Sequence, residues 1–435
     1  MSADLEDRRS RLSPEKRALL ERRLRGLTVE AETVPTPAPP AEIEDLPDLR
    51  QVLFGGPAGV APISGQLWQR LVAAGQRAAG ELAELPDLIA DAAREGSLDA
   101  QAAAIVACGL AGLGLFQSPG EAHTVDELIR DHGVLPKHRK VLHRWLATLA
   151  EAGMLERQGE SFVAKAPIPT PEIVACVAPE HRTYYAENLA KVLDGRTHPL
   201  EFYLPGGSSQ SVETSYRELP IFRYCNGIAS AVLAEQAAAV PAESRVRLVE
   251  VGAGTGGTTS SLLPLLPAER SLFLFTDVSK FFTDLGRKKY GDLGFVAARE
   301  LDLEREPDEQ GYPAGGFDWL IAAHVLHATR QVEDTLRRVR RLLAPGGVLL
   351  LLEEVRFQRK YHFSMGFLPG FDSFEDAKLR PLHPLLPAAD WGRELLASGF
   401  ADFATFTPEG TAAWTLGVDV MIARADLSDS DSFRP

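Results

Sequence analysis

The chain has 435 residues, enough for two or three domains, and its formal net charge of −14 argues against nucleic acid or an anionic membrane as the main partner. Its three widely spaced cysteines argue against a disulfide framework or a thiolate zinc site, and no stretch reaches the roughly 18 apolar residues of a membrane span. The N-terminus carries no apolar run typical of a secretory signal, so we expect a cytoplasmic protein.

Residues 1–47 are predicted to form a basic helix, which begins at Ser13-Pro14, followed by a proline-rich linker. Residues 48–168 show helical spacing of alanine and leucine. Within them, a capped helix from Thr124, a second helix over 136–153 and two short β-like pieces are typical of a winged-helix unit.

The second helix of this unit is basic, with Lys137, Arg139, Lys140 and Arg144, which in a winged helix could contact DNA. Such units also serve as packing or dimerisation modules, and nothing else in the chain is basic enough for a DNA reader. We therefore expect no nucleic-acid partner, and a homodimer stays open.

Residues 169–241 are predicted to connect this region to the next domain and to contribute to a substrate and cofactor pocket. Over 242–424, short apolar runs alternate with helical stretches, and 425–435 form a tail. This βαβ series predicts an α/β fold with a mostly parallel sheet and helices on both faces. The apolar runs are 246–251, 272–276, 295–297, 319–323 and 348–352.

A glycine-rich loop follows the first of these runs, in Glu250-Val-Gly-Ala-Gly-Thr-Gly-Gly257. Glycines such as Gly252, Gly254 and Gly256 allow a tight turn and a close approach of ligand to backbone. Gly252, Gly254 and Gly257 also satisfy GxGxxG, so a dinucleotide is an alternative ligand. Glu250 favours another ligand, because its carboxylate suits the ammonium of a methionine moiety better than a pyrophosphate.

Two further acids follow strand ends: Asp277, suited to ribose hydroxyls, and Asp302, suited to an adenine amino group. The turn Pro345-Gly-Gly347 before the last buried run is a recurrent mark of class I methyltransferases and not of dehydrogenases. Together these features predict a Rossmann-like class I methyltransferase sheet that binds S-adenosyl-L-methionine. An NAD-dependent oxidoreductase fails on this turn and on the absence of a hydride-transfer motif.

From about 198 to 400 the chain resembles the methyltransferase domains of modular polyketide synthases and mixed peptide–polyketide synthases. The resemblance rests on motifs spread over this range. They are 204–207, 216–226, 250–259, 275–279, 310–312, 325–329, 343–347, 383–386 and Trp391.

The resemblance implies methyl transfer to an acyl chain on the phosphopantetheine of an acyl carrier protein. It implies a catalytic histidine–glutamate pair, His327 as the base and Glu353 as its carboxylate partner, with Glu353 preferred to Glu354. It also assigns Tyr216 and Asn226 to cofactor binding. His327 and Glu353 also follow the ends of two predicted strands, at the edge where open α/β sheets bind ligands. The imidazole suits proton abstraction, and a carboxylate on its far nitrogen would fix the tautomer.

The chain departs from the family at His324, where asparagine is usual; an imidazole can still donate one hydrogen bond to the cofactor. The segment 367–376 lacks the Gly-Trp-Trp pattern of carbon-methylating relatives, which favours O-methylation of a β-hydroxyl. C-methylation at the α-carbon of a β-ketoacyl chain is the alternative.

A non-catalytic cofactor-binding scaffold and a cofactor-sensing winged-helix regulator are rival hypotheses. The ten histidines show no ligand spacing, so we expect no metal. Carrier proteins are commonly acidic, so basic residues of the N-terminal helix or of 137–144 are candidate contacts.

Overall fold

The computed structural model describes residues 49–54, 59–170, 175, 177, 179–197, 219–367 and 370–427. The chain divides into two units, residues 1–48 and 49–435, so all described residues belong to the second unit. The predicted basic helix and linker, Tyr216, the motif 204–207 and most of the tail lie outside the described residues.

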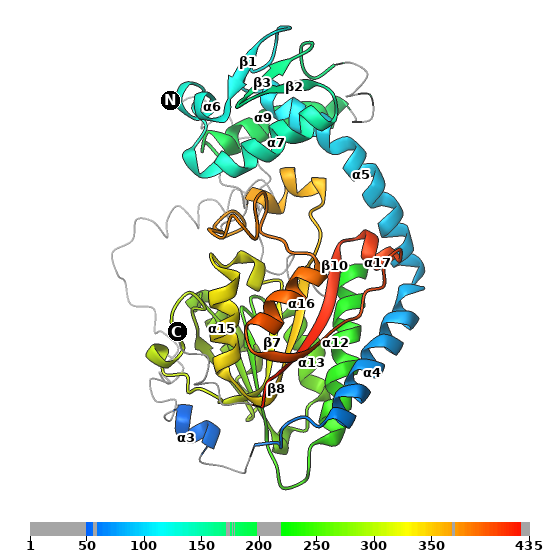
Figure 1. Ribbon diagram of the computed structural model, residues 1–435, viewed down its shortest axis with the longest axis vertical. Coiled ribbons are helices and arrows are strands. Elements are labelled where there is room, and N and C mark those ends of the chain that lie inside the picture. Colours follow the sequence, from blue (N-terminus) through cyan, green and yellow to red (C-terminus); the bar gives the residue numbers. More distant parts are fainter. Residues whose placement is uncertain are drawn as a thin grey trace, which may run out of the picture. The chain divides into compact units, whose positions relative to one another are not determined.

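The predicted parallel sheet is present and forms the centre of the structure (Figure 1). Its neighbouring strands pair in parallel from β6 to β8, whereas β10 runs antiparallel to both β8 and β9. In sheet order the seven strands are β6 (Val296–Glu300), β5 (Ser271–Asp277), β4 (Val246–Val251), β7 (Phe317–Ala323), β8 (Leu343–Glu354), β10 (Val418–Ala425) and β9 (Phe400–Thr405).

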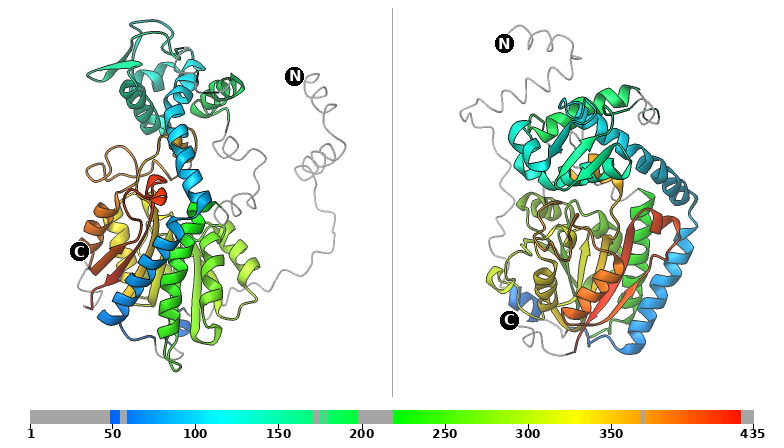
Figure 2. Two further views of the ribbon diagram at one scale, coloured as in Figure 1. Left: turned by 90° about the vertical axis from the view of Figure 1, so that its right-hand side faces the viewer. Right: turned by 45° about the horizontal axis from the view of Figure 1, so that its top comes forward.

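Two helical layers cover this sheet because successive strand residues point to opposite faces. Leu248 belongs to one core cluster, with residues of α4 (Gly65–Ala83), α12 (Pro220–Ala239) and α13 (Gly257–Leu262). Its neighbour Val249 belongs to the other, with residues of α3 (Leu49–Phe54), α15 (Val332–Leu342) and α16 (Ala388–Ala397). Figure 2 shows α4 and α12 running side by side along the sheet.

Several shorter elements lie between these strands and helices along the chain. They are α14 (Lys280–Tyr290), α17 (Ala412–Thr415) and the 3₁₀ turns η2 (Leu263–Leu265), η3 (Ala268–Arg270), η4 (Asp308–Gln310), η5 (Leu326–Ala328), η6 (Arg359–Phe363) and η7 (Met365–Phe367). The η5 turn follows β7 directly, and η6 and η7 follow β8, so all three continue from the carboxyl ends of parallel strands.

The helical region before the sheet contains the winged-helix arrangement that the sequence predicts. A small sheet in the order β1-β3-β2 packs with α7, and Thr124 and Glu127 cap α6 reciprocally. The elements are α5 (Pro86–Ala111), β1 (Ala122–Thr124), α6 (Val125–Asp131), η1 (Pro136–His138), α7 (Arg139–Glu151), β2 (Leu155–Gln158), β3 (Ser161–Ala164) and α9 (Pro179–Leu193).

The long helix α5 connects the two hydrophobic cores. Leu88, near its start, is buried in the core beneath the large sheet, whereas Ile105 and Leu110 are buried in the core of the winged-helix unit. Among the described helices, none has both the length and the apolar composition needed to cross a membrane.

An ion pair between neighbouring strands lies inside the large sheet. Arg247 of β4 donates from Nε (3.1 Å), from a terminal guanidinium nitrogen (2.7 Å) and from its backbone N–H (2.8 Å) to the Asp318 carboxylate of β7. Burial raises the pKa of Asp318, and the Arg247 guanidinium opposes that shift. Removing either residue would leave the other as a buried charge without this counter-ion.

We expect Asp318→Ala to lower the free energy of unfolding by about 3–5 kcal/mol, because Arg247 would stay buried without its counter-ion. Urea denaturation measures this change. The matched control is Arg70→Ala, which breaks a largely exposed pair with Glu235 and should cost less than about 1 kcal/mol. Equal losses in the two variants would contradict the expectation.

Candidate active site

The glycine loop connects the buried strand β4 to the short helix α13 in a backbone conformation that needs glycine. Gly252 and Gly254 have φ of 60° and 55°, in the left-handed region. A Cβ on Gly252 would lie 2.4 Å from Cγ2 of Val325, whereas a Cβ on Gly254 would have only the Gly252 carbonyl oxygen within 4 Å, at 3.9 Å. The loop is therefore closely packed at Gly252 and open at Gly254.

A pocket of about 230 Å³ lies at this open side. It combines the loop with the ends of β4 and β7 and with one aromatic side chain from α14. Its lining consists of Glu250, Gly252, Ala253, Gly254, Thr255, Gly257, Thr258, Phe282, Ala323 and His324. Four predicted cofactor-binding residues thus share one pocket: Glu250, Gly252, Gly254 and His324.

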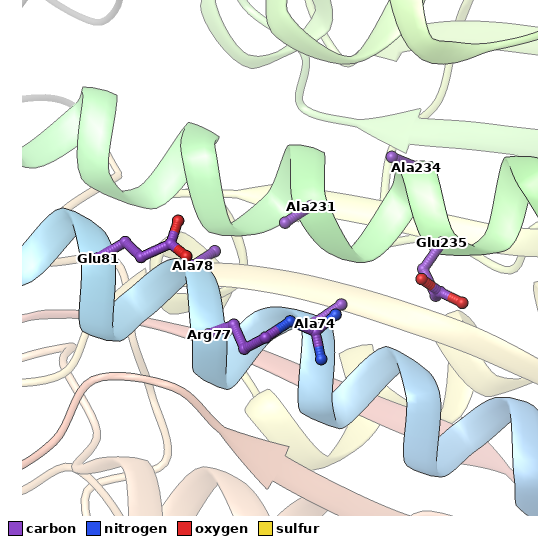
Figure 3. A pocket seen from close by; sticks show the side chains of 7 residues that line it. All are labelled: Ala74, Arg77, Ala78, Glu81, Ala231, Ala234 and Glu235. Carbon is purple, nitrogen blue, oxygen red and sulfur yellow. The ribbon is translucent and has the colours of Figure 1, made fainter.

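A second hollow, of about 300 Å³, lies between α4 and α12 (Figure 3). Alanines line most of it. Its polar residues are Arg77, Glu81 and Glu235. Although this hollow is larger, its lining contains no histidine and no glycine loop beside its two carboxylates, so the pocket at the glycine loop is the better candidate.

Glu250 is a buried carboxylate at the floor of the pocket, with 1% of its surface exposed. It accepts a hydrogen bond of 2.5 Å from the Thr259 hydroxyl. Burial raises its pKa to about 8, with the Thr259 hydrogen bond opposing and the charge of Asp277 adding to the shift. A cation in the pocket would favour the ionised carboxylate, so the site is suited to a positively charged group.

Asp277, Asp302 and Asn226, also predicted to bind the cofactor, are not part of the pocket lining. Asp277 ends β5 and accepts hydrogen bonds from the backbone N–H groups of Gly254 (3.0 Å) and Ser279 (2.8 Å). Asp302 follows β6 and accepts from the N–H of Glu304 at 2.8 Å. Asn226 is buried on α12. Their roles toward a ligand stay predictions.

Gly256 also stands apart from the lining. A Cβ there would lie 2.9 Å from the Tyr290 hydroxyl oxygen, which indicates a packing role between the loop and α14. Tyr216 lies outside the described residues.

The two residues of the predicted histidine–glutamate pair lie together at the carboxyl ends of β7 and β8. His327 lies on η5, and its Nδ1 is 2.5 Å from Oε2 of Glu353. The other carboxylate oxygen accepts from the backbone N–H groups of Leu326 (2.8 Å) and Val325 (3.2 Å). Glu353 therefore fixes both the turn and the imidazole that the turn carries.

Both members of this pair are buried, His327 at 5% and Glu353 at 0% exposure. Burial alone would lower the pKa of His327, but the charge and hydrogen bond of Glu353 outweigh it, so the pKa is raised. With a proton on Nδ1 directed at Glu353, Nε2 is the nitrogen left to accept a proton from a substrate.

The structure adds a second histidine–glutamate pair that the sequence did not reveal. His324 Nδ1 is 2.8 Å from Glu354 Oε2, and His324 has a φ of 57°, unusual for a residue with a side chain. Burial would raise the pKa of Glu354, but His324 lowers it to about 2. Each of the two neighbouring carboxylates pairs with its own imidazole, although Glu354 Oε2 also lies 4.0 Å from His327 Nδ1.

One atom each of His327, Glu353 and Glu354 lies within 4.8 Å of the others, a spacing that a metal ion could use. Both carboxylates already pair with imidazole nitrogens. Catalysis without a metal stays a prediction.

Residues 249–349 match a family described as a methyltransferase domain. The chain is 33% identical over 344 residues to the polyketide synthase ThaQ of Burkholderia thailandensis, a match that covers 72% of this chain and 16% of that synthase. It therefore spans less than a fifth of this curated relative.

Two solved structures are similar over nearly their full length. The carbon methyltransferase CurJ is 30% identical with a TM-score of 0.73, covering 82% of this chain and 99% of that chain. The carbon methyltransferase DszA is 27% identical with a TM-score of 0.73, covering 86% and 99%. The expected class I methyltransferase sheet with a helical N-terminal region is thereby confirmed.

The raised pKa of Glu250 predicts how stability depends on pH when the pocket holds no cation. Between the ordinary value of 4.5 and about 8, the folded chain keeps a proton that the unfolded chain releases. Stability should therefore fall as pH rises through this range.

We expect Glu250→Gln, which still accepts from Thr259, to remove this contribution. From pH 5 to pH 8 the wild type should lose stability relative to Glu250→Gln by up to about 1 kcal/mol per pH unit. Chemical denaturation at several pH values measures the difference, and two parallel curves would count against a raised pKa.

Proposed function

Since the chain belongs to the methyltransferase domains of polyketide synthases, we propose that it transfers a methyl group from S-adenosylmethionine to the α-carbon of a β-ketoacyl chain on an acyl carrier protein. The observation that carries this proposal is the His327–Glu353 pair at 2.5 Å, next to the pocket of the glycine loop.

The choice of carbon over oxygen corrects the preference drawn from the sequence. That preference rested on segment 367–376, of which Leu368 and Pro369 lie outside the described residues. The similar solved structures CurJ and DszA are both described as carbon methyltransferases. Their similarity covers more than four fifths of this chain and therefore outweighs one local motif.

The residues of the glycine-loop pocket fit S-adenosylmethionine. Glu250 offers a buried carboxylate to the ammonium of the methionine part, and its hydrogen-bond partner among the described residues is the Thr259 hydroxyl. The open side of Gly254 lets a ligand approach the backbone closely. Phe282 adds an apolar wall, and Asp277 lies one hydrogen bond behind the loop through the Gly254 N–H.

In the proposed reaction, S-adenosylmethionine supplies an electrophilic methyl group and leaves as a neutral thioether. His327 Nε2 takes the proton from the α-carbon, whose C–H electrons become the new bond to the methyl carbon. Glu353 holds the imidazole by Nδ1 and stabilises the imidazolium that forms. Burial of both groups keeps water from competing for the proton.

The partner follows from the family. The curated relative ThaQ is described as a polyketide synthase, and the family resemblance implies an acyl chain held on a carrier protein. We propose a phosphopantetheine-linked β-ketoacyl chain as acceptor, because its α-hydrogen lies between two carbonyl groups and can be removed by an imidazole.

Intact-mass spectrometry tests this function. A β-ketoacyl carrier protein incubated with the chain and S-adenosylmethionine should gain one methyl group, and tandem analysis of the released acyl chain should place it on the α-carbon. His327→Ala should slow the reaction on the order of 100-fold or more, because the base is lost.

A β-hydroxyacyl carrier protein, run in parallel, separates the alternatives. Methylation of its hydroxyl in place of the α-carbon would overturn the proposal in favour of O-methylation. Calorimetric binding of S-adenosylmethionine without turnover of either acceptor would instead indicate a non-catalytic scaffold.

Glu353→Gln tests the role of the carboxylate. The pKa of His327 is raised by Glu353, so the acidic limb of the pH profile of kcat/KM should move to lower pH in this variant. The plateau should fall on the order of 100-fold, because the tautomer is no longer fixed. The matched control is Glu354→Gln, whose main partner is His324; an equal shift of the limb in both variants would contradict the assignment.

A further inference from the structure

The segment 371–384 connects two distant parts of the described chain: helix α7 of the winged-helix unit and the η5 turn that carries His327. It follows η7 and contains no regular helix or strand. Because it lacks its own secondary structure, its position depends on the side chains that bind it from either end.

Arg144 of α7 binds the beginning of this segment. Its two terminal guanidinium nitrogens donate to the two carboxylate oxygens of Asp372 at 2.7 and 3.0 Å, and one of them also donates to the Leu382 carbonyl at 3.1 Å. Arg144 is 5% exposed, and the Asp372 side chain 14%. This bidentate geometry fixes the direction of the carboxylate as well as its distance.

Lys140, one turn earlier on α7, adds a second attachment. Its ammonium donates to the carbonyl oxygens of Asp372, at 2.9 Å, and of Phe374, and lies 3.4 Å from the centre of the Phe374 ring. Two of the four basic residues predicted for the second helix of the winged-helix unit, Lys140 and Arg144, are therefore directed into the protein. This leaves Lys137 and Arg139 exposed, which reduces the basic surface available to a carrier protein or to DNA.

Arg380 binds the same segment to the catalytic turn. Its guanidinium donates to the backbone carbonyl oxygens of His327 at 2.7 Å and of Thr329 at 2.8 Å, and its Nε to Asp376 at 2.6 Å. Its side chain is fully buried. A displacement of 371–384 would therefore be transmitted to the backbone of His327.

Phe371 lies between these attachments, directly before Asp372. Its ring is buried, with its centre 6.4 Å from that of the His327 imidazole and 6.1 Å from that of Tyr361. The Arg144 guanidinium lies 5.7 Å from the same ring. The Phe371 ring thus forms a wall beside the imidazole that receives the proton, and its backbone is held by Arg144 through Asp372.

We propose that Arg144 is a positioning residue for methyl transfer: through Asp372 it holds Phe371 against His327 and so sets the acceptor side of the active site. Stability alone is a poor reason for such a pair, because the cost of removing two charges from water offsets much of their attraction. A fixed geometry is what the two-pronged contact supplies.

This inference rests on the proposed function, since it assigns Arg144 a role in the reaction at His327. Arg144→Met should lower kcat for the β-ketoacyl carrier protein on the order of 100-fold, as expected for a small displacement of reacting groups. The dissociation constant of S-adenosylmethionine, measured by calorimetry, should stay within about twofold of the wild type, because none of the residues lining the cofactor pocket belongs to 371–384.

Two further variants separate positioning from folding. Arg144→Lys keeps the charge but not the two-pronged contact, so it should recover only part of the lost kcat. Arg130→Ala is the matched control in the same winged-helix unit, because Arg130 of α6 pairs with Asp131 at the surface; its kcat should equal that of the wild type. If Arg144→Met does not fold, Asp372→Asn, which keeps the shape of the partner, takes its place.

A readout independent of turnover keeps this test separate from that of the proposed function. Removal of Arg144 should change the NMR shift of the His327 ring protons, since the Phe371 ring lies beside them, and Arg130→Ala should leave it unchanged. A wild-type shift in Arg144→Met overturns the inference, as does a wild-type kcat or a loss of cofactor affinity in parallel with kcat. Lack of turnover by the wild type, with the NMR change still present, overturns the proposed function alone.

Discussion

The carboxylate of Glu353 is the point on which the active site depends. One oxygen accepts from the backbone of the turn after β7, and the other faces Nδ1 of His327. A fully buried carboxylate at a strand end is unfavourable without such partners. The position of the end of β8 therefore fixes the positions of the turn and of the imidazole. Because β8 pairs with β7 on one side and β10 on the other, the rigidity of the sheet passes directly to the base.

The charges around this point explain which ligand the pocket accepts. His327 with Glu353 and His324 with Glu354 form two buried pairs, in which each carboxylate faces an imidazole whose pKa is raised. Among the described residues, Glu250 by contrast has a hydroxyl and no cation as its hydrogen-bond partner, and burial raises its pKa to about 8. Of these buried acids, it is therefore the one whose charge an incoming cation can stabilise. An ammonium group at Glu250 adds a charge where the described residues supply none, without disturbing the two histidine–glutamate pairs.

Much of this could be predicted from local sequence. The βαβ alternation and the glycine loop with Glu250 were predicted because strand ends and loop glycines leave a signal within a few residues. The His327–Glu353 pair was implied by the family resemblance and supported by the two predicted strand ends. The antiparallel strands β9 and β10 were not among the predicted strands. The edge strand β9 is half-buried and has no strong period, whereas β10 is buried between β8 and β9 and follows the end of the βαβ series. The His324–Glu354 pair was missed because two residues 30 positions apart meet only once the register between β7 and β8 is known. The inward direction of Lys140 and Arg144 depends likewise on segment 371–384, more than 200 residues later.

The same difference in sequence distance separates the two halves of the site. Most of the residues that line the cofactor pocket lie between 250 and 258, and the others are Phe282, Ala323 and His324. The chemistry of the pocket can therefore be inferred largely from one motif. The surroundings of His327, which we propose to form the acceptor side, include Tyr361 and the segment 371–384 held by α7, and these parts meet only in the folded chain. A change at Arg144 or Phe371 can therefore alter the surroundings of His327 while the glycine loop stays as it is. In the proposed reaction the wall beside the acceptor therefore depends on contacts between distant segments, so similarity along the whole domain is a better guide to the acceptor than segment 367–376 alone.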